Sequence, residues 1–507
     1  MKKYIINITL VIPFLIIFTS CNDFLKEEPK TFLSPDFYFQ SPSQVKAAVN
    51  GVYTFLDDIF DATIGPGTEV YLFLEYLPGY GDRPYSSSDE NLNQAFNLNV
   101  KEDNYYVERL WSSAYLAIEN CNSIIENMPK VTTEIMNENE KNKLWGEVYF
   151  LRAYNYFNLV RLFGDVPLKL KSTRDLTDIK IPLSSVEEVY SQIEKDLIAA
   201  DSLMSNDEWV NGEGRIAKGA VKSLLAKVYI TMAGYPLLKG VPFYQKAYEK
   251  ADAVMKSNKF YIFNSYADLR KVANENTGEY IWMIQRESQY APSPVHFNLL
   301  PYPEPEKPIS AAGSYGGALA PSLAFYNSYA TNDKRIEEKE YYYTSHETLQ
   351  DPNVTVDLER PYIYKYWDDD AAKTGKSGKN YPLIRYADIL LILAEAKTQI
   401  DGGTTNDVNA INAYYEVRKR AFPDESKPTT ITTEDVLKER FWEICFEGQT
   451  WYDMLRTRKA LNVTTRNIID LIGYNAPSHP EGHPFKEGDM LFPYPLREKR
   501  LNPNLIR

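Results

Sequence analysis

The chain has 507 residues, of which 44% are hydrophobic and 25% charged, and its formal net charge is −13. A chain of this length can bury a large core. Its acidic balance and its lack of a long basic run argue against nucleic-acid binding, which requires lysine and arginine to neutralise phosphates.

A hydrophobic N-terminal segment predicts export of the protein. Lys2 and Lys3 precede an apolar run over residues 5–19, which is shorter than the roughly 20 residues that span a bilayer. We expect residues 1–20 to be a lipoprotein signal peptide that is removed before Cys21. The freed cysteine could then carry acyl chains such as palmitate and anchor the mature chain to a membrane. A cysteine buried in a signal anchor is the alternative.

Apolar residues at helical spacing dominate the chain. They predict helices over residues 41–60, 105–128, 140–164 and 185–203. Two further helical pairs, residues 217–236 with 243–261 and residues 385–403 with 406–421, look like tetratricopeptide (TPR) hairpins. Such hairpins stack on one another to form a shared core. The spacing between the pairs is irregular, so no array with a fixed period is expected.

Three long segments between the helices are rich in aromatic residues and are predicted to be irregular: residues 71–94, 285–330 and 341–381. Long irregular segments in compact domains are often functional. Tyrosine and tryptophan offer flat apolar faces with polar tips, which suit ligand binding. Packing within the loops is the alternative for each ring. The candidate ligand-binding residues are Tyr80, Asp82, Arg83, Tyr85, Tyr290, Tyr302, Tyr315 and Trp367.

No catalytic or cofactor-binding motif is visible, which weakens an enzyme interpretation without excluding it, and we expect no cofactor. The four histidines have no zinc-like spacing with cysteines, and no metal site is expected. The acidic run 368–370 resembles a cation site, but a solvated loop is the preferred interpretation. We expect Cys121 and Cys445 to be small core residues, although a disulfide between them is possible.

The segment 434–461 combines an apolar helix face with several glutamate and arginine residues. A carboxylate site is one interpretation of these charges. We expect instead that they form ion pairs between helices, because glutamate and arginine at helical spacing often pair.

Seven segments together resemble the SusD/RagB family in order and spacing, from Cys21 to Leu505. They are CNDFLKEEP, LRAYNYFNLVRLFGDVPL, VEEVYSQIEKDLIAAD, GRIAKGAVKSLLAKVYI, YPLIRYADILLILAEA, ERFWEICFEGQTWYDMLR and LFPYPLREKRLNPNL. The chain departs from the family at Gln449 and Thr450, where a basic residue often precedes Trp-Tyr-Asp.

The resemblance implies a mainly α fold with TPR-like hairpins and a loop-rich ligand-binding part. It implies one SusD-like domain over residues 21–507, with an N-terminal part over residues 21–230 and a RagB/SusD C-terminal part over residues 270–507. A lipid anchor would hold the protein on the cell surface of the outer membrane.

The resemblance also implies that the protein captures glycan and delivers it, uncleaved, to a SusC-like TonB-dependent transporter, which the TPR-like helices contact. A peptide-binding lid of the same type, a TPR-like scaffold without a small ligand, and a surface polysaccharide hydrolase are the alternatives.

Overall fold

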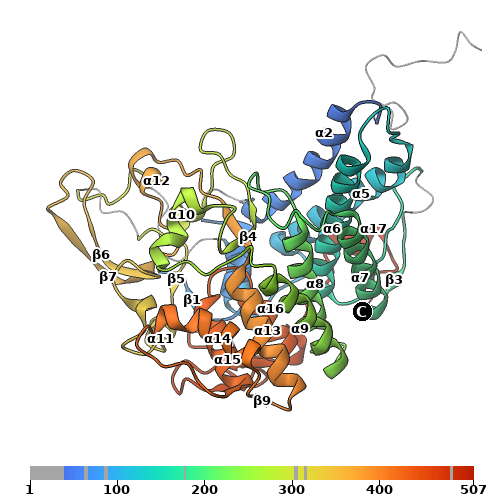
Figure 1. Ribbon diagram of the computed structural model, residues 1–507. Coiled ribbons are helices and arrows are strands. Elements are labelled where there is room, and N and C mark those ends of the chain that lie inside the picture. Colours follow the sequence, from blue (N-terminus) through green and yellow to red (C-terminus); the bar gives the residue numbers. More distant parts are fainter. Residues whose placement is uncertain are drawn as a thin grey trace, which may run out of the picture.

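The computed structural model describes residues 39–61, 67–84, 89–175, 179–301, 306–312, 317–479 and 483–506. Helices dominate these residues, and their strands are short and form two-stranded sheets. Figure 1 shows long helices on one side of the molecule and hairpins, short helices and loops on the other. The predicted mainly α fold class is confirmed.

The four predicted N-terminal helices are present, and polar side chains begin each of them. The Ser185 hydroxyl accepts a hydrogen bond from Glu188 N, and the Glu188 carboxylate accepts one from Ser185 N, which satisfies two free amides of the first turn. Gly164, at φ 71°, ends the third helix in a backbone conformation that favours glycine. The elements are α2 (Pro42–Tyr53), which continues as the 3-10 helix η2 (Thr54–Phe60), α5 (Tyr105–Asn127), α6 (Glu138–Phe163) and α7 (Val186–Leu203).

Both predicted helical pairs are also present, and they lie side by side. The first consists of α8 (Lys218–Ala233) and α9 (Val241–Lys256), and the second of α13 (Tyr386–Ile400) and α14 (Val408–Ala421). Helix α9 packs against both α8 and α13. The two pairs therefore share one core, as stacked TPR-like hairpins do.

The remaining helices are short, and most of them lie between the long helices along the chain. Two of them carry the predicted helical segment 434–461, which is broken after Glu443. They are α3 (Val70–Tyr76), α4 (Glu90–Phe96), η3 (Met128–Lys130), η4 (Tyr266–Arg270), η5 (Val272–Asn274), α10 (Val295–Asn298), α11 (Leu323–Tyr326), η6 (Lys334–Ile336), α12 (Asp369–Thr374), α15 (Thr433–Glu443), α16 (Thr450–Thr457), η7 (Glu487–Asp489) and α17 (Leu496–Leu501).

All six sheets in the described residues are antiparallel pairs of strands. The longest is the hairpin of β6 and β7, in which Tyr343 lies opposite Tyr362. The pairs are β1 (Gly81–Asp82) with β5 (Ala320–Pro321), β2 (Val166–Pro167) with β3 (Leu183–Ser184), β4 (Tyr280–Ile284) with β8 (Tyr381–Arg385), β6 (Tyr342–Glu347) with β7 (Thr355–Ile363), β9 (Thr404–Thr405) with β10 (Ile431–Thr432), and β11 (Lys459–Leu461) with β12 (Ile468–Asp470).

Two of the three segments predicted to be irregular contain regular structure instead. The first includes most of α3, in which six of the seven residues are buried, so its near-continuous apolar run marks a buried helix rather than a loop. The third includes the β6–β7 hairpin and α12. The segment over residues 285–330 contains only short elements among its described residues.

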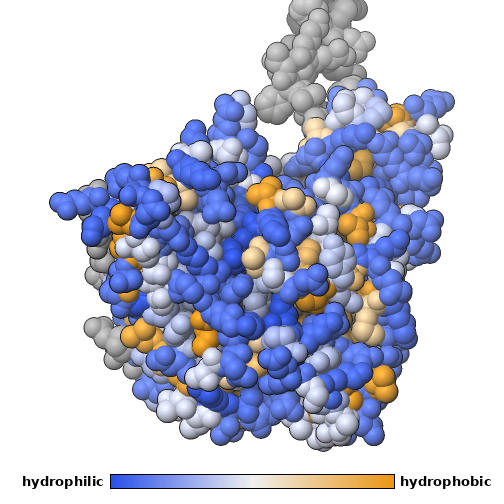
Figure 2. Space-filling model, turned by 60° about the vertical axis from the view of Figure 1, so that its left-hand side comes forward, coloured by the Kyte–Doolittle hydropathy of each residue, from blue (hydrophilic) through white to orange (hydrophobic). Residues whose placement is uncertain are grey.

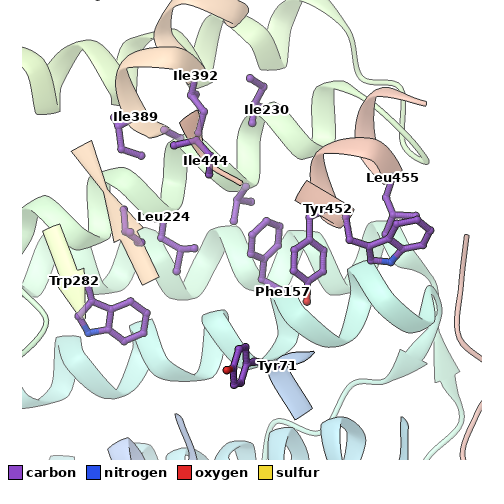
Figure 3. Packing of buried hydrophobic residues seen from close by; sticks show 14 of the residues in the cluster. Tyr71, Phe157, Leu224, Ile230, Trp282, Ile389, Ile392, Ile444, Tyr452 and Leu455 are labelled. Atoms are coloured by element: carbon purple, nitrogen blue, oxygen red, sulfur yellow. The ribbon is translucent and has the colours of Figure 1, made fainter. Parts of the chain in front are cut away.

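The core lies where helices of both halves of the chain meet. Figure 3 shows Phe157 of α6, Leu224 of α8, Ile392 of α13 and Tyr452 of α16 within one cluster of buried side chains. All four side chains are buried. Burial of such side chains contributes about 1.5–3 kcal/mol each, so this contact joins the N-terminal helices firmly to the C-terminal ones.

Buried ion pairs hold the C-terminal helices together, which confirms the ion-pair interpretation of segment 434–461. The Glu443 carboxylate accepts hydrogen bonds from Arg335 at 3.3 Å, Arg385 at 2.8 Å and Arg420 at 2.7 Å. Arg440 bonds Asp388 and Asp453, and Arg456 bonds Asp453 and Glu395. Each charge is matched by several partners, as burial of charge requires.

Cys121 and Cys445 are both buried and unpaired. The Cys445 thiol donates to Trp442 O at 3.2 Å. Both cysteines are thus core residues, as predicted, and no disulfide joins them.

Candidate ligand-binding site

The first aromatic segment brings Tyr80 into the core, where its ring is only 2% exposed. The Tyr80 hydroxyl donates to Leu461 O at 3.1 Å and accepts from Leu461 N at 2.7 Å, and the ring stacks on Phe325 at 4.9 Å. The expectation that Tyr80 presents a ring face to a ligand is therefore corrected. Its planar ring and its hydroxyl are both used for packing in the protein.

Asp82 and Arg83 follow Tyr80 and lie partly exposed at the edge of the same segment. Asp82 pairs with Arg360 at 2.8 Å. Arg83 donates to Asn93 Oδ1, and its guanidinium lies over the rings of Tyr76 and Phe96. Both residues thus have structural partners while part of each side chain stays accessible.

Arg360 of β7 connects all three aromatic segments. Its Nη1 donates to Asp82 Oδ2 at 2.8 Å, and its Nη2 donates to Pro321 O at 2.7 Å. In addition, β1 pairs directly with β5, so that Asp82 lies opposite Ala320. Arg360 was not among the predicted site residues. The apolar and polar alternation of β7 could have identified the strand but not the partner of this arginine.

The third segment contains Trp367 in a cluster of aromatic side chains. The Trp367 ring stacks on Tyr364 with centroids 5.1 Å apart, and its centroid lies 4.2 Å from that of His346. Its Nε1 donates to Asp369 Oδ1 at 2.8 Å. Trp367 is buried, so the expectation of an accessible ring is corrected here as well. The cluster forms a small second core beneath the loops.

Among the predicted aromatic residues that the structure describes, Tyr290 is the one left accessible, with 84% of it exposed. It lies in the turn between Glu287 and Ala291, which exchange backbone hydrogen bonds at 3.1 and 3.0 Å. The Glu287 carboxylate accepts from Tyr290 N at 2.8 Å and from Gln289 N at 2.9 Å. The ring is therefore presented to solvent from a turn whose backbone is fixed.

Hydrogen bonds also fix this turn to the neighbouring segment 376–380. Arg286 N donates to Asn380 Oδ1 at 2.6 Å, and Ser293 N donates to Ser377 O at 2.9 Å. Ser377 in turn donates to Asp368 Oδ2 at 2.6 Å. The second segment thus contacts the third on both sides of Tyr290.

The acidic run 368–370 has a local structural role. Asp368 is buried and begins α12, where its carboxylate accepts from Asp370 N at 3.0 Å and Ala371 N at 3.2 Å. Such a cap satisfies the free amides of a first helical turn. Among the residues that the structure describes, no group of three or more histidine, cysteine or acidic residues is arranged to hold a metal ion.

The other predicted residues lie outside the described part of the chain. They are Cys21, Tyr85, Tyr302 and Tyr315.

Comparisons with known proteins assign the family. Residues 24–230 match a family model described as starch-binding and associating with the outer membrane, and residues 325–507 match a model of the SusD family. A solved SusD superfamily protein from Parabacteroides distasonis is 32% identical, with a TM-score of 0.84, and the match covers 91% of this chain and 98% of that one. The chain belongs to the SusD family.

Other SusD proteins are also similar over nearly the whole chain, at lower identity. SusD-like protein P2 of Formosa agariphila is 28% identical over 100% of this chain and 99% of its own. A solved laminarin-binding SusD-like protein is 22% identical with a TM-score of 0.71, over 91% of this chain and 98% of that one. The last similarity shows a shared fold.

The SusD family is associated with the outer membrane, as the description of the first family model states. Within the described ranges, we find no helix that combines the length and the hydrophobicity needed to span a bilayer.

Proposed function

We propose that this SusD-family protein captures glycans at the cell surface with its loop-rich side and does not cleave them. One observation carries the proposal: three aromatic segments far apart in the chain converge, are joined by Arg360 and the β1–β5 pair, and present Tyr290 to solvent. An exposed ring on a fixed backbone is suited to stacking on the apolar face of a sugar.

The rest of this side supplies polar groups. Figure 2 shows a mainly hydrophilic surface on which apolar residues form small, separate patches. Partly exposed charged side chains such as Asp82 and Arg83 could meet sugar hydroxyls. The description of one structural neighbour as laminarin-binding supports glycan as the ligand class.

The proposal extends to the anchor and the transport partner. Removal of residues 1–20 and acylation of Cys21 would attach the protein to the outer membrane. From there it would deliver glycan to a SusC-like TonB-dependent transporter. The family's association with the outer membrane supports this location.

Native gels that contain single polysaccharides test the proposal. The purified chain without its lipid anchor, residues 22–507, should migrate more slowly in a gel with its glycan than in a gel without polysaccharide. Starch, laminarin and xyloglucan form a first panel. Thin-layer chromatography of the same mixtures should show no released oligosaccharide. Free migration across a wide polysaccharide panel, or release of products, would contradict the proposal, and retention by peptide ligands alone would favour a peptide-binding lid.

A further inference from the structure

The turn that presents Tyr290 carries three further exposed side chains, those of Glu287, Ser288 and Gln289. They offer a carboxylate, a hydroxyl and an amide beside the ring. The turn lies tightly against the third aromatic segment, where a Cβ added to Gly378 would lie only 3.1 Å from Ser288 N. The four side chains therefore reach solvent from one fixed backbone.

The two oxygens of the Glu287 carboxylate have different surroundings. Oε2 accepts from Tyr290 N at 2.8 Å and from Gln289 N at 2.9 Å. Among the described residues, the donor that reaches Oε1 is the Ser288 hydroxyl, at 3.5 Å. This is longer than the usual distance of about 2.5–3.0 Å between a hydroxyl and an oxygen acceptor. An ionised carboxylate has about four acceptor positions, so Oε1 is available to donors outside the protein.

The charge of Glu287 is not neutralised by a neighbouring cation. Its polar contacts in the described part of the chain are those with the turn, and no lysine or arginine there is within ion-pair distance. The adjacent Arg286 is directed inward instead. Its side chain is 3% exposed, its guanidinium pairs with Asp57, and its Cζ lies 4.3 Å from the Phe60 ring centroid. A ligand beside Tyr290 therefore meets an unpaired negative charge.

The carboxylate lies close to the base of the Tyr290 side chain, because Glu287 Oε2 is 2.8 Å from the Tyr290 backbone nitrogen. A sugar that stacks on the ring through its apolar face brings its hydroxyl groups to the edge of the ring. Hydroxyl groups donate to carboxylates, and such charge-assisted hydrogen bonds are about twice as strong as neutral ones. The ring and the free Oε1 therefore suit the two kinds of surface that one sugar offers.

We propose that Glu287 contacts the glycan beside Tyr290, accepts hydrogen bonds from its hydroxyl groups, and selects uncharged glycans over acidic ones. The selection follows from the unpaired charge of Glu287, because it repels a carboxylate or sulfate group on a glycan. This inference rests on the proposed capture of glycans and specifies the class of glycan that the site takes.

Native gels with starch, laminarin or xyloglucan, and with the carboxymethyl derivative of each polymer, test the inference on the Glu287→Gln variant. The glutamine oxygen can still accept from both turn amides, while its NH2 group replaces Oε1 and the charge is lost. Affinity is measured from the retardation at increasing polymer concentration. It should fall about fivefold for the uncharged polymer, since a neutral hydrogen bond replaces a charge-assisted one. It should rise about fivefold for the carboxymethyl derivative, because the repulsion between two charges about 4 Å apart in water is removed.

Opposite shifts distinguish a direct contact from a structural role, because a disturbed turn would weaken the binding of both polymers. Glu338→Gln is the matched control and should change neither affinity. Glu338 is also exposed and accepts from two backbone amides, those of Thr344 and Ser345. A Glu287→Gln variant without opposite shifts would overturn the inference and leave glycan capture standing. An unmodified chain that no polymer of a wide panel retards would overturn both.

Discussion

The guanidinium of Arg360 donates to the Asp82 carboxylate at 2.8 Å and joins two strands that are 278 residues apart in the chain. The second donor group of the same side chain bonds Pro321 O. One side chain thus sets the relative positions of three segments. Since a binding site must hold its contact residues within a narrow geometry, this contact matters for the proposed glycan site although Arg360 need not touch the ligand.

Replacement of Arg360 by methionine should loosen this frame without unfolding the protein. The pair with Asp82 is partly exposed, so its loss should lower the free energy of unfolding by only about 1 kcal/mol. Hydrogen–deuterium exchange of residues 317–322 should become faster, and retention by the bound glycan should fall. Arg497→Met, which removes an exposed pair with Glu108, is the matched control. Unchanged exchange in Arg360→Met would show that Arg360 does not hold the segments together.

The Glu443 carboxylate should be among the most sensitive positions for stability. It is buried and accepts hydrogen bonds from three arginines. Removal of one partner from a buried ion-pair network costs about 3–5 kcal/mol. We therefore expect Glu443→Gln to lower the free energy of unfolding in urea by this amount.

Glu434→Gln provides the comparison for Glu443→Gln within the same helix. Glu434 pairs with Lys438 one turn away on the exposed side of α15, and such pairs contribute about 0.3–0.5 kcal/mol. Similar losses for the two variants would contradict the stabilising role of the buried network.

Glu75 should make the stability of the protein depend on pH near neutrality. Burial raises the pKa of Glu75 to about 7, and its carboxylate accepts from Gly448 N. This pKa lies above the pKa of Glu75 in the unfolded chain. The contribution of Glu75 to the free energy of unfolding is therefore fully present below about pH 4.5 and is lost as pH rises toward 7. Glutamine keeps the acceptor oxygen and cannot ionise.

Relative to the unmodified protein, the Glu75→Gln variant should therefore be about 2 kcal/mol more stable at pH 8 than it is at pH 5. Urea denaturation at the two pH values measures it, with Glu249→Gln on the exposed side of α9 as the control. A difference that does not change with pH would contradict a raised Glu75 pKa.

Substitution of Cys21 by serine should abolish lipid attachment. Cells expressing the full-length chain and grown with labelled palmitate should show label in the unmodified protein and none in Cys21→Ser. The variant should also leave the outer-membrane fraction, since anchoring depends on the acyl chains. Cys121→Ser is the control, because that cysteine is buried. Labelling that survives in Cys21→Ser would contradict acylation at Cys21.

The long helices could be predicted from sequence because their signals are local. The apolar spacing lies within each helix, and capping residues such as Ser41 and Ser185 lie directly before it. The buried helix α3 and the β6–β7 hairpin were missed, because a short apolar run alone does not separate helix, strand and loop. The sequence predicted that the charges of segment 434–461 form ion pairs. It did not predict the partners of Glu443, because these come from distant segments.

The ligand-binding residues were harder to predict, for a physical reason that Tyr80 and Tyr290 illustrate. Both occur beside turn-forming or polar residues in aromatic segments, yet Tyr80 is buried against Phe325 and Tyr290 is exposed. Burial depends on which distant segment packs against each ring, and local sequence does not specify that. The pairing of Asp82 with Arg360 likewise depends on a distant segment, so local sequence does not specify it.

The most direct test of glycan capture by the loop-rich side compares two exposed tyrosines. Tyr290 lies in the second aromatic segment, and Tyr261, which is 58% exposed, lies outside all three segments. Affinity for the glycan that retards the chain in native gels should be measured by calorimetric titration of Tyr290→Ala and Tyr261→Ala. We predict about tenfold weaker binding for Tyr290→Ala, equivalent to about 1.4 kcal/mol, and unchanged binding for Tyr261→Ala. Equal affinity of Tyr290→Ala and the unmodified protein would contradict the proposed site.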